Sequence, residues 1–307
     1  MENWDVPLDW ETPPRPVSLI RADVNRALEQ RRQAEYTKVV RDLPALIDEC
    51  VHAVHTNSGE GQREAYEALG GTFRCVFTVS WKFGFLDLAT VALDCLAWTA
   101  PRADEPGLEA MYGFLRAQTT LASGRYDVGM RVVDRALRDL EGQVARRPAG
   151  IEAMPGMLHL RAAVIAGRTK DRNQADARLA EARHLAEQTG ELPDYGVTWG
   201  PANVGVHSVA IAAEMEEFGQ AIELAESVRI PRGWTRSRAG HHWMDLAKAH
   251  AWEGNPAEAL DALQKARRIA PQQTRYHPTT RETVFALKRR ERTRSGSLSQ
   301  YAEWIGL

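Results

Sequence analysis

The stretch HHWMDLAKAHAWEGNPAEALDALQKARRIAP, residues 241–271, decides the fold. Alanines recur in it where two antiparallel helices have to approach closely, and Trp243 and Leu263 are spaced to fill the seam between them. Gly254 is expected to end the first helix, because glycine readily adopts the left-handed backbone of a C-cap. The second helix is expected to begin at Pro256, behind an asparagine N-cap, and to end before the closing proline. The stretch therefore predicts a helical hairpin.

The spacing within this hairpin matches the tetratricopeptide (TPR) repeat, W-x2-L-G-x2-Y followed by A-x3-F and P. With His at the Tyr position and Leu at the Phe position, the matching residues are Trp243, Leu246, Ala247, His250, Ala259, Leu263, Ala266 and Pro271. Weaker copies lie upstream at residues 19–56, 62–98, 107–141, 153–188 and 199–229, with turns at 33–36, 84–87, 124–127, 170–173 and 216–219. Their recurrence carries weight because each hairpin needs neighbours to cover its apolar face.

The chain is therefore expected to be all-α, a right-handed superhelical solenoid of about six TPR-like helical hairpins that forms a single domain over residues 19–307. A helix over 278–292 and a short one ending at Trp304 and Ile305 would cap the stack. Residues 1–18, rich in proline, are expected to form an extended linker. Longer loops between hairpins are expected at 101–106, 146–156 and 190–202.

Composition and charge exclude several classes of protein. The 307 residues are 44% hydrophobic, and 39 Lys and Arg against 41 Asp and Glu leave a formal net charge of -2, so no overall positive field attracts nucleic acid. The cysteines are few and widely spaced, unlike a secreted disulfide scaffold. No signal peptide and no apolar stretch of membrane-spanning length is found. We expect a cytoplasmic protein with reduced cysteines and no membrane partner.

Signatures of the common enzyme classes are missing: GxxxxGK, GxGxxG, GxSxG, HExxH and CxxC do not occur. We therefore expect no catalytic residue and no cofactor. His52 and His55, near Cys50, and the adjacent His241 and His242 lack further ligands at metal-site spacing. We interpret them as core or exposed histidines and expect no metal.

The C-terminal half resembles a known family. The carrying segments are WGPANVGVH (199–207), RAGHHWMDLA (238–247), YHP (276–278), RETV (281–284) and the final Gly306-Leu307. They resemble the TPR region of actinobacterial helix-turn-helix transcriptional regulators of the Xre type, over residues 20–307. In that family an N-terminal DNA-binding domain precedes this region, and we find no such pattern here. The resemblance implies a sensing or dimerising role, a homodimer, and contact with DNA only through an N-terminal domain that this chain lacks.

The first helix of each stacked hairpin lines the inner surface, so residues beside its core positions are the binding candidates. Counting from the turns gives Arg74, Thr78, Trp81, Phe114, Gln118, Arg161, Val164, Met244 and Lys248; the loop-to-helix segment adds Trp199, Asn203 and His207. Asn203 and His207 lie four apart and share a helix face. For any one of these residues, packing, solvent exposure or anchoring of a loop is the alternative to ligand contact. The basic run 288–294 is interpreted as a solvated helix end, with a phosphate contact as the alternative.

Three functions follow from these patterns. The first is a sensor region that binds a small-molecule or peptide effector on its concave surface. The second is an adaptor that docks a protein segment and has no role at DNA. The third is a repeat scaffold recruited as an enzyme through a polar pocket around Arg74, Gln118, Asn203 and His207, which would need a perturbed acid or base beside it.

Overall fold

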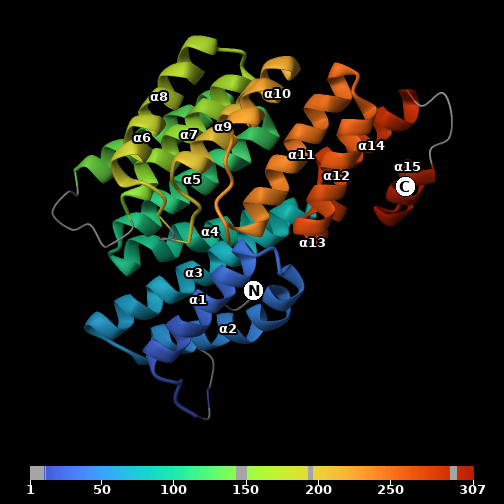
Figure 1. The fold of residues 1–307 in the computed structure, drawn as a ribbon. Helices are drawn as coiled ribbons and strands as arrows, with labels where there is room; N and C mark the ends of the chain where they lie inside the picture. The colour runs from blue at the N-terminus through green and yellow to red at the C-terminus, as the bar shows by residue number, and fades with distance from the viewer. Residues whose placement is uncertain (1–9, 11, 143–150, 193–195, 291–295) are drawn as a thin grey trace.

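The computed structural model describes residues 10, 12–142, 151–192, 196–290 and 296–307. Within these ranges the chain is all-α and forms a solenoid of helical hairpins, as the repeat spacing predicts (Figure 1). The helices are α1 (Val17–Arg32), α2 (Tyr36–Thr56), α3 (Gly59–Phe83), α4 (Leu86–Ala103), α5 (Pro106–Ser123), α6 (Tyr126–Glu141), α7 (Ala153–Arg168), α8 (Arg172–Thr189), α9 (Pro201–Glu214), α10 (Phe218–Ser227), α11 (Arg236–Glu253), α12 (Pro256–Ile269), α13 (Pro271–Tyr276), α14 (Pro278–Arg290) and α15 (Gly296–Trp304).

One turn geometry repeats in all six hairpins and confirms the predicted turns. In each, one residue has a left-handed backbone: Ala34, Gly84, Gly124, Lys170, Glu216 and Gly254. The next N–H donates to the carbonyl five residues earlier, as in Phe85 to Ser80 and Asn255 to His250, which closes each first helix with a Schellman motif. Three of the turns therefore keep this geometry without glycine, which explains why those repeats are weak in sequence.

The odd-numbered helices form the inner layer of the solenoid. Contacts join α1 to α3, α3 to α5, α5 to α7, α7 to α9 and α9 to α11. Among the described residues no comparable contacts join α4 to α6, α6 to α8 or α8 to α10, so the second helices splay apart on the outside. This difference in spacing curves the stack around its first helices.

The curvature brings the two ends of the stack together. Helix α1 contacts α11, and α13 contacts α3, so the first helices close a ring. Tyr36 Oη donates to Gln273 Oε1 at 2.6 Å and lies 3.1 Å from Ser237 Oγ, and the Thr37 N–H donates to Gln272 Oε1 at 3.0 Å. Phe83 packs edge-on against both Tyr36 and Tyr276. These contacts join α2 and α3 to α11 and α13.

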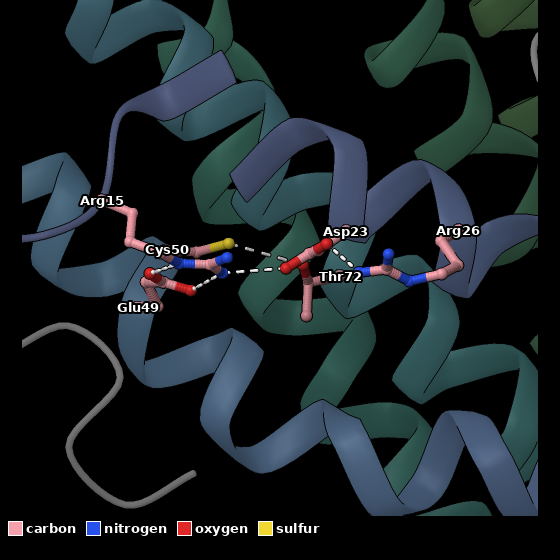
Figure 2. A network of polar contacts seen from close by, with 6 residues as sticks. All are labelled: Arg15, Asp23, Arg26, Glu49, Cys50 and Thr72. Carbon is pink, nitrogen blue, oxygen red and sulfur yellow. Dashed lines mark hydrogen bonds and ion pairs between the residues drawn. The ribbon is translucent and has the colours of Figure 1, made fainter. Parts of the chain in front are cut away.

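The N-terminal segment is tied to the first hairpin (Figure 2). Arg15 makes ion pairs with Glu49 at 2.5 Å and Asp23 at 2.8 Å, and Asp23 also pairs with Arg26. Cys50 Sγ lies 3.6 Å from Thr72 Oγ1 beside these ion pairs. Helix α1 begins at Val17, so among residues 1–18 only the part up to Pro16 is extended where described.

One predicted loop is wrong and another is correct. Helix α4 continues through Pro101 to Ala103, because Ala100 and Ala103 stay buried there, so 101–106 is not a long loop. Of the predicted loop 190–202, the described residues 190–192 and 196–200 lie outside helices, with a bridge between Leu192 and Trp199. Of the segment 146–156, residues up to 150 lie outside the described ranges and α7 begins at Ala153.

Candidate functional site

Polar and charged side chains from five of the ring helices and from the end of α13 form what we call the central cluster. Its members are Arg31 on α1, Lys82 on α3, Arg161 on α7, His207 on α9, Arg238, His241 and Asp245 on α11, and His277 after α13. The three residues of α11 are spaced three and four apart, so they share one helix face. All eight keep intermediate solvent exposure, yet burial is the largest cause of every pKa shift among them. Partial access combined with strong desolvation fits an enclosed interior rather than an outer surface.

Arg161 and Arg238 are held by neutral partners. Arg161 Nη2 donates to Gln118 Oε1 at 3.1 Å, and its guanidinium lies 4.2 Å from the Phe114 ring centroid. Arg238 Nε donates to Asn203 Oδ1 at 2.7 Å. Burial, together with the mutual proximity of the two guanidinium groups, lowers the pKa of Arg161 to about 9, and burial lowers that of Arg238 to about 10. Both remain cations at neutral pH.

Lys82 and Arg31 add positive charge from the ends of α3 and α1. Burial first, then Arg238, lowers the pKa of Lys82 to about 8. Arg31 Nη2 donates to the Gly196 carbonyl at 2.6 Å, and burial lowers its pKa as well. Arg74 Nη2 donates to the same carbonyl at 2.6 Å, so two arginines hold the segment that precedes α9.

Asp245 is the one carboxyl group of the central cluster. Its Oδ2 lies 3.8 Å from His241 Nε2, and its side chain is 14% exposed. Burial raises its pKa to about 7, against the opposing attraction of Arg238. At neutral pH it therefore carries only part of a negative charge.

The histidines of the central cluster are neutral at physiological pH. Burial, reinforced by nearby cations, lowers the pKa of His207 and His241 well below the usual value and that of His277 to about 3. His241 and His277 pack edge to face with ring centroids 4.9 Å apart. Each of them can therefore donate or accept a hydrogen bond without adding charge.

The structure brings together a core of the predicted binding residues. Phe114, Gln118 and Arg161 form one contact group, and Asn203 and His207 lie with Arg238 beside it. Asn203 is 1% exposed, so it positions Arg238 and is not itself open to a ligand.

Other predicted residues lie elsewhere. Trp199 and Met244 have no exposure and belong to the core: Trp199 packs over Gly156 and donates to Thr189 Oγ1, while Met244 Sδ accepts from Thr280. Arg74 is buried against its loop and Thr78 donates to the Arg74 carbonyl. Trp81 stacks on Phe77, Val164 packs against the main core, and Lys248 lies 6.0 Å from the Trp252 ring.

Sequence reasoning missed Arg31, Lys82, Arg238, His241, Asp245 and His277. On α11 the prediction was wrong by one residue. Met244 is buried in the hydrophobic core, and its neighbour Asp245 belongs to the central cluster beside His241. The three-and-four spacing of Arg238, His241 and Asp245, which puts polar side chains on one helix face, was the available signal. Arg31 and His277 come from opposite ends of the stack, and only closure of the ring brings them near the others.

Within the described ranges no group of three or more His, Cys, Asp or Glu could hold a metal ion. The three cysteines are free and buried. Trp10 stacks on His52 with ring centroids 4.2 Å apart and lies 6.2 Å from His55, so a tryptophan covers this pair. Across the same described ranges no helix is long and apolar enough to cross a membrane.

Comparison with known proteins leaves the family open. No family model and no curated protein matches the chain. Among solved structures, BtubC (BKLC) from P. vanneervenii is similar over 85% of this chain and 94% of that chain, at 16% identity and a TM-score of 0.43. A likeness this distant says nothing about what the central cluster binds.

Proposed function

We propose that this chain is the effector-sensing and dimerisation region of a bacterial transcriptional regulator, and that it binds its small-molecule or peptide effector inside the ring of first helices. The observation that carries the proposal is the central cluster, in which partly exposed polar side chains far apart in sequence come together from packed first helices. Convergent polar groups with aromatic side chains beside them are typical of ligand sites. Phe114 is such an aromatic residue here, buried beneath the Arg161 guanidinium, which lies 4.2 Å from its ring centroid.

A ligand in this place would be positioned to control the shape of the whole stack. It would contact helices from the first and last hairpins at once, and these hairpins meet through the packing of α1 on α11 and the contacts of Tyr36 and Thr37 with Gln272, Gln273 and Ser237. Binding energy gained across that junction would shift the solenoid between open and closed forms. Such a shift is what a sensor region transmits to a DNA-binding domain.

The proposed homodimer is supported by an apolar strip at the start of α4. Phe85, Leu86, Leu88 and Val91 are 59%, 47%, 40% and 46% exposed. Large apolar side chains gathered on an outer helix favour a protein interface. We propose this strip as part of the contact between two copies.

The experiment that tests the proposal is a thermal-shift screen of the chain against metabolites and short peptides, because a ligand of the folded state raises the melting temperature by mass action. A genuine effector is expected to lose its shift in His207→Leu and keep it in the control His184→Leu, where His184 is exposed on α8. Light scattering with and without the hit then measures its effect on the dimer. Flat results across broad libraries, or hits indifferent to His207→Leu, would refute the sensor function.

One observation favours a second candidate, the enzyme. Asp245, with a pKa raised to about 7 and His241 beside it, is a perturbed acid within the central cluster. If the interior is catalytic, a hit from the screen is converted with time, and Asp245→Asn stops the conversion while retaining binding. A hit recovered unchanged after long incubation rules this candidate out.

A further inference from the structure

The central cluster carries an imbalance of charge. Four of its members, Arg31, Lys82, Arg161 and Arg238, are cations, and Asp245 is its only acid and is half-ionised near neutral pH. The chain as a whole has a formal net charge of -2, so this positive charge is concentrated inside the ring and compensated outside it. Like charges held close in a desolvated place repel each other unless a counter-ion joins them.

Several polar atoms of the central cluster have no hydrogen-bond partner among the described residues. Arg161 Nε and Arg238 Nη2 are buried and have no hydrogen-bond partner among the described residues. The same holds for Nδ1 of His207 and His241 and for one acceptor of the central cluster, Asp245 Oδ2. Lys82 forms no hydrogen bond or ion pair with any described residue. Buried polar atoms without partners cost free energy, and in native proteins they point to a missing ligand, ion or water.

These groups converge on one place. Arg238 lies near enough to Arg161 and Lys82 to depress the pKa of each, and both arginines depress that of His207. They come from α3, α7, α9 and α11, and α9 packs against both α7 and α11. A groove for an extended peptide would instead distribute donors along its length.

We propose that the ring interior binds a small organic molecule through an oxyanion, a phosphate or carboxylate group, held between Arg161 and Arg238 with Lys82 beside them. This inference rests on the proposed function and names the chemistry of its effector. Guanidinium groups suit planar or tetrahedral oxyanions because they donate two parallel hydrogen bonds. A DNA backbone is excluded, since a duplex cannot enter a ring closed by Tyr36 and Gln273.

Because the central cluster has excess positive charge, removal of one of its cations should stabilise the free protein and weaken binding of the anion. Without ligand, Lys82 contributes desolvation and repulsion, so Lys82→Met is expected to raise the melting temperature of the free protein. The same change should weaken binding of an oxyanion at least about tenfold, since it removes a charged partner. A side chain with a merely structural role would move stability in the opposite direction.

The test is titration calorimetry and thermal shift of the full chain with inorganic phosphate and with citrate, each against sodium chloride at equal ionic strength. Phosphate and citrate represent the two sources of the oxyanion, and low concentrations avoid their general stabilising effect on proteins. The variants are Lys82→Met and Arg238→Gln. Their matched controls are Lys288→Met and Arg289→Gln, because both of these residues are exposed on α14.

The expected result is saturable binding of at least one anion, lost in the two cluster variants and kept in the two controls, with Lys82→Met more stable than the parent when free. Equal responses to chloride, or undiminished binding in both cluster variants, would overturn the inference. If the anions fail but a neutral ligand binds in a manner that depends on His207, the oxyanion is wrong and the sensor function stands. If an anion binds at the central cluster and leaves the oligomeric state unchanged, the site stands and the sensor function is wrong.

Discussion

Acidification should unfold this protein through its buried histidines. Burial lowers the pKa of His242 to about 4 and that of His277 to about 3, against 6.5 for an exposed histidine. Below pH 6.5 these histidines are protonated in the unfolded chain but stay neutral in the folded chain. Their contribution to the free energy of unfolding is therefore fully present above pH 6.5 and falls as the pH drops below it. Asp245, with its pKa raised to about 7, acts oppositely, because the folded chain holds the extra proton.

The net effect can be worked from these values. Between about pH 7 and about pH 5, His242 and His277 each lower the free energy of unfolding by about 2 kcal/mol, and Asp245 raises it by about 2 kcal/mol. The remaining loss is about 2 kcal/mol, and His207 and His241, whose pKa values are lowered in the same direction, add to it. This loss compares with a free energy of unfolding of roughly 5–15 kcal/mol for a typical domain.

Urea unfolding followed by circular dichroism at several pH values measures this loss. His277→Gln should flatten the dependence by about 2 kcal/mol over the same interval, and Asp245→Asn should steepen it by about 2 kcal/mol. His184→Gln, at an exposed position, should leave it unchanged. A free energy of unfolding that is flat from pH 7 to pH 5, or identical slopes in all variants, would refute the burial assigned to these groups.

Three further changes test the packing and the proposed surface. Tyr36→Phe should cost about 1–2 kcal/mol in urea unfolding, because it removes the hydroxyl that donates to Gln273 across the closure of the ring. Gly156→Ala should lower the free energy of unfolding by about 3 kcal/mol or more, since a methyl group there overlaps the Trp199 ring. Alanine favours the helix over glycine by about 1 kcal/mol, so a net loss below about 1 kcal/mol would contradict that contact. Leu88→Glu should shift the chain from dimer to monomer in light scattering without lowering its melting temperature, and an unchanged mass would remove this strip from the dimer contact.

The hairpins and their turns could be read from sequence because they depend on local rules. Caps, helical spacing and small residues at close contacts are all encoded within one repeat, and they placed every turn, including those at Lys170 and Glu216 that lack glycine. The extension of α4 past Pro101 was not predictable in this way, because buried alanines decide it.

The site was only partly predictable for a different reason. Arg161, Gln118 and His207 could be found because counting along first helices gives the inner face. Met244 was wrongly placed there, since an error of one residue rotates a helical side chain by about 100°. Trp199 lies before α9 and packs into the core over Gly156. The pairing of Arg31 with residues of α7 and α11 depends on the curvature of the whole stack, which is set by packing between repeats and not by any one of them.

The central cluster and the proposed ligand site both require that the first and last hairpins meet. A cross-link between these hairpins tests this contact directly. Thr37 and Gln272 are 235 residues apart in sequence, yet the Thr37 N–H and Gln272 Oε1 lie 3.0 Å apart. Since the native cysteines are buried, the pair Thr37→Cys and Gln272→Cys can be joined selectively by mild oxidation or a short bismaleimide. The account predicts rapid intramolecular joining, seen as a compact band on a denaturing gel and a linked peptide in mass spectrometry. Two cysteines that react singly with the reagent and never join within one chain would contradict it.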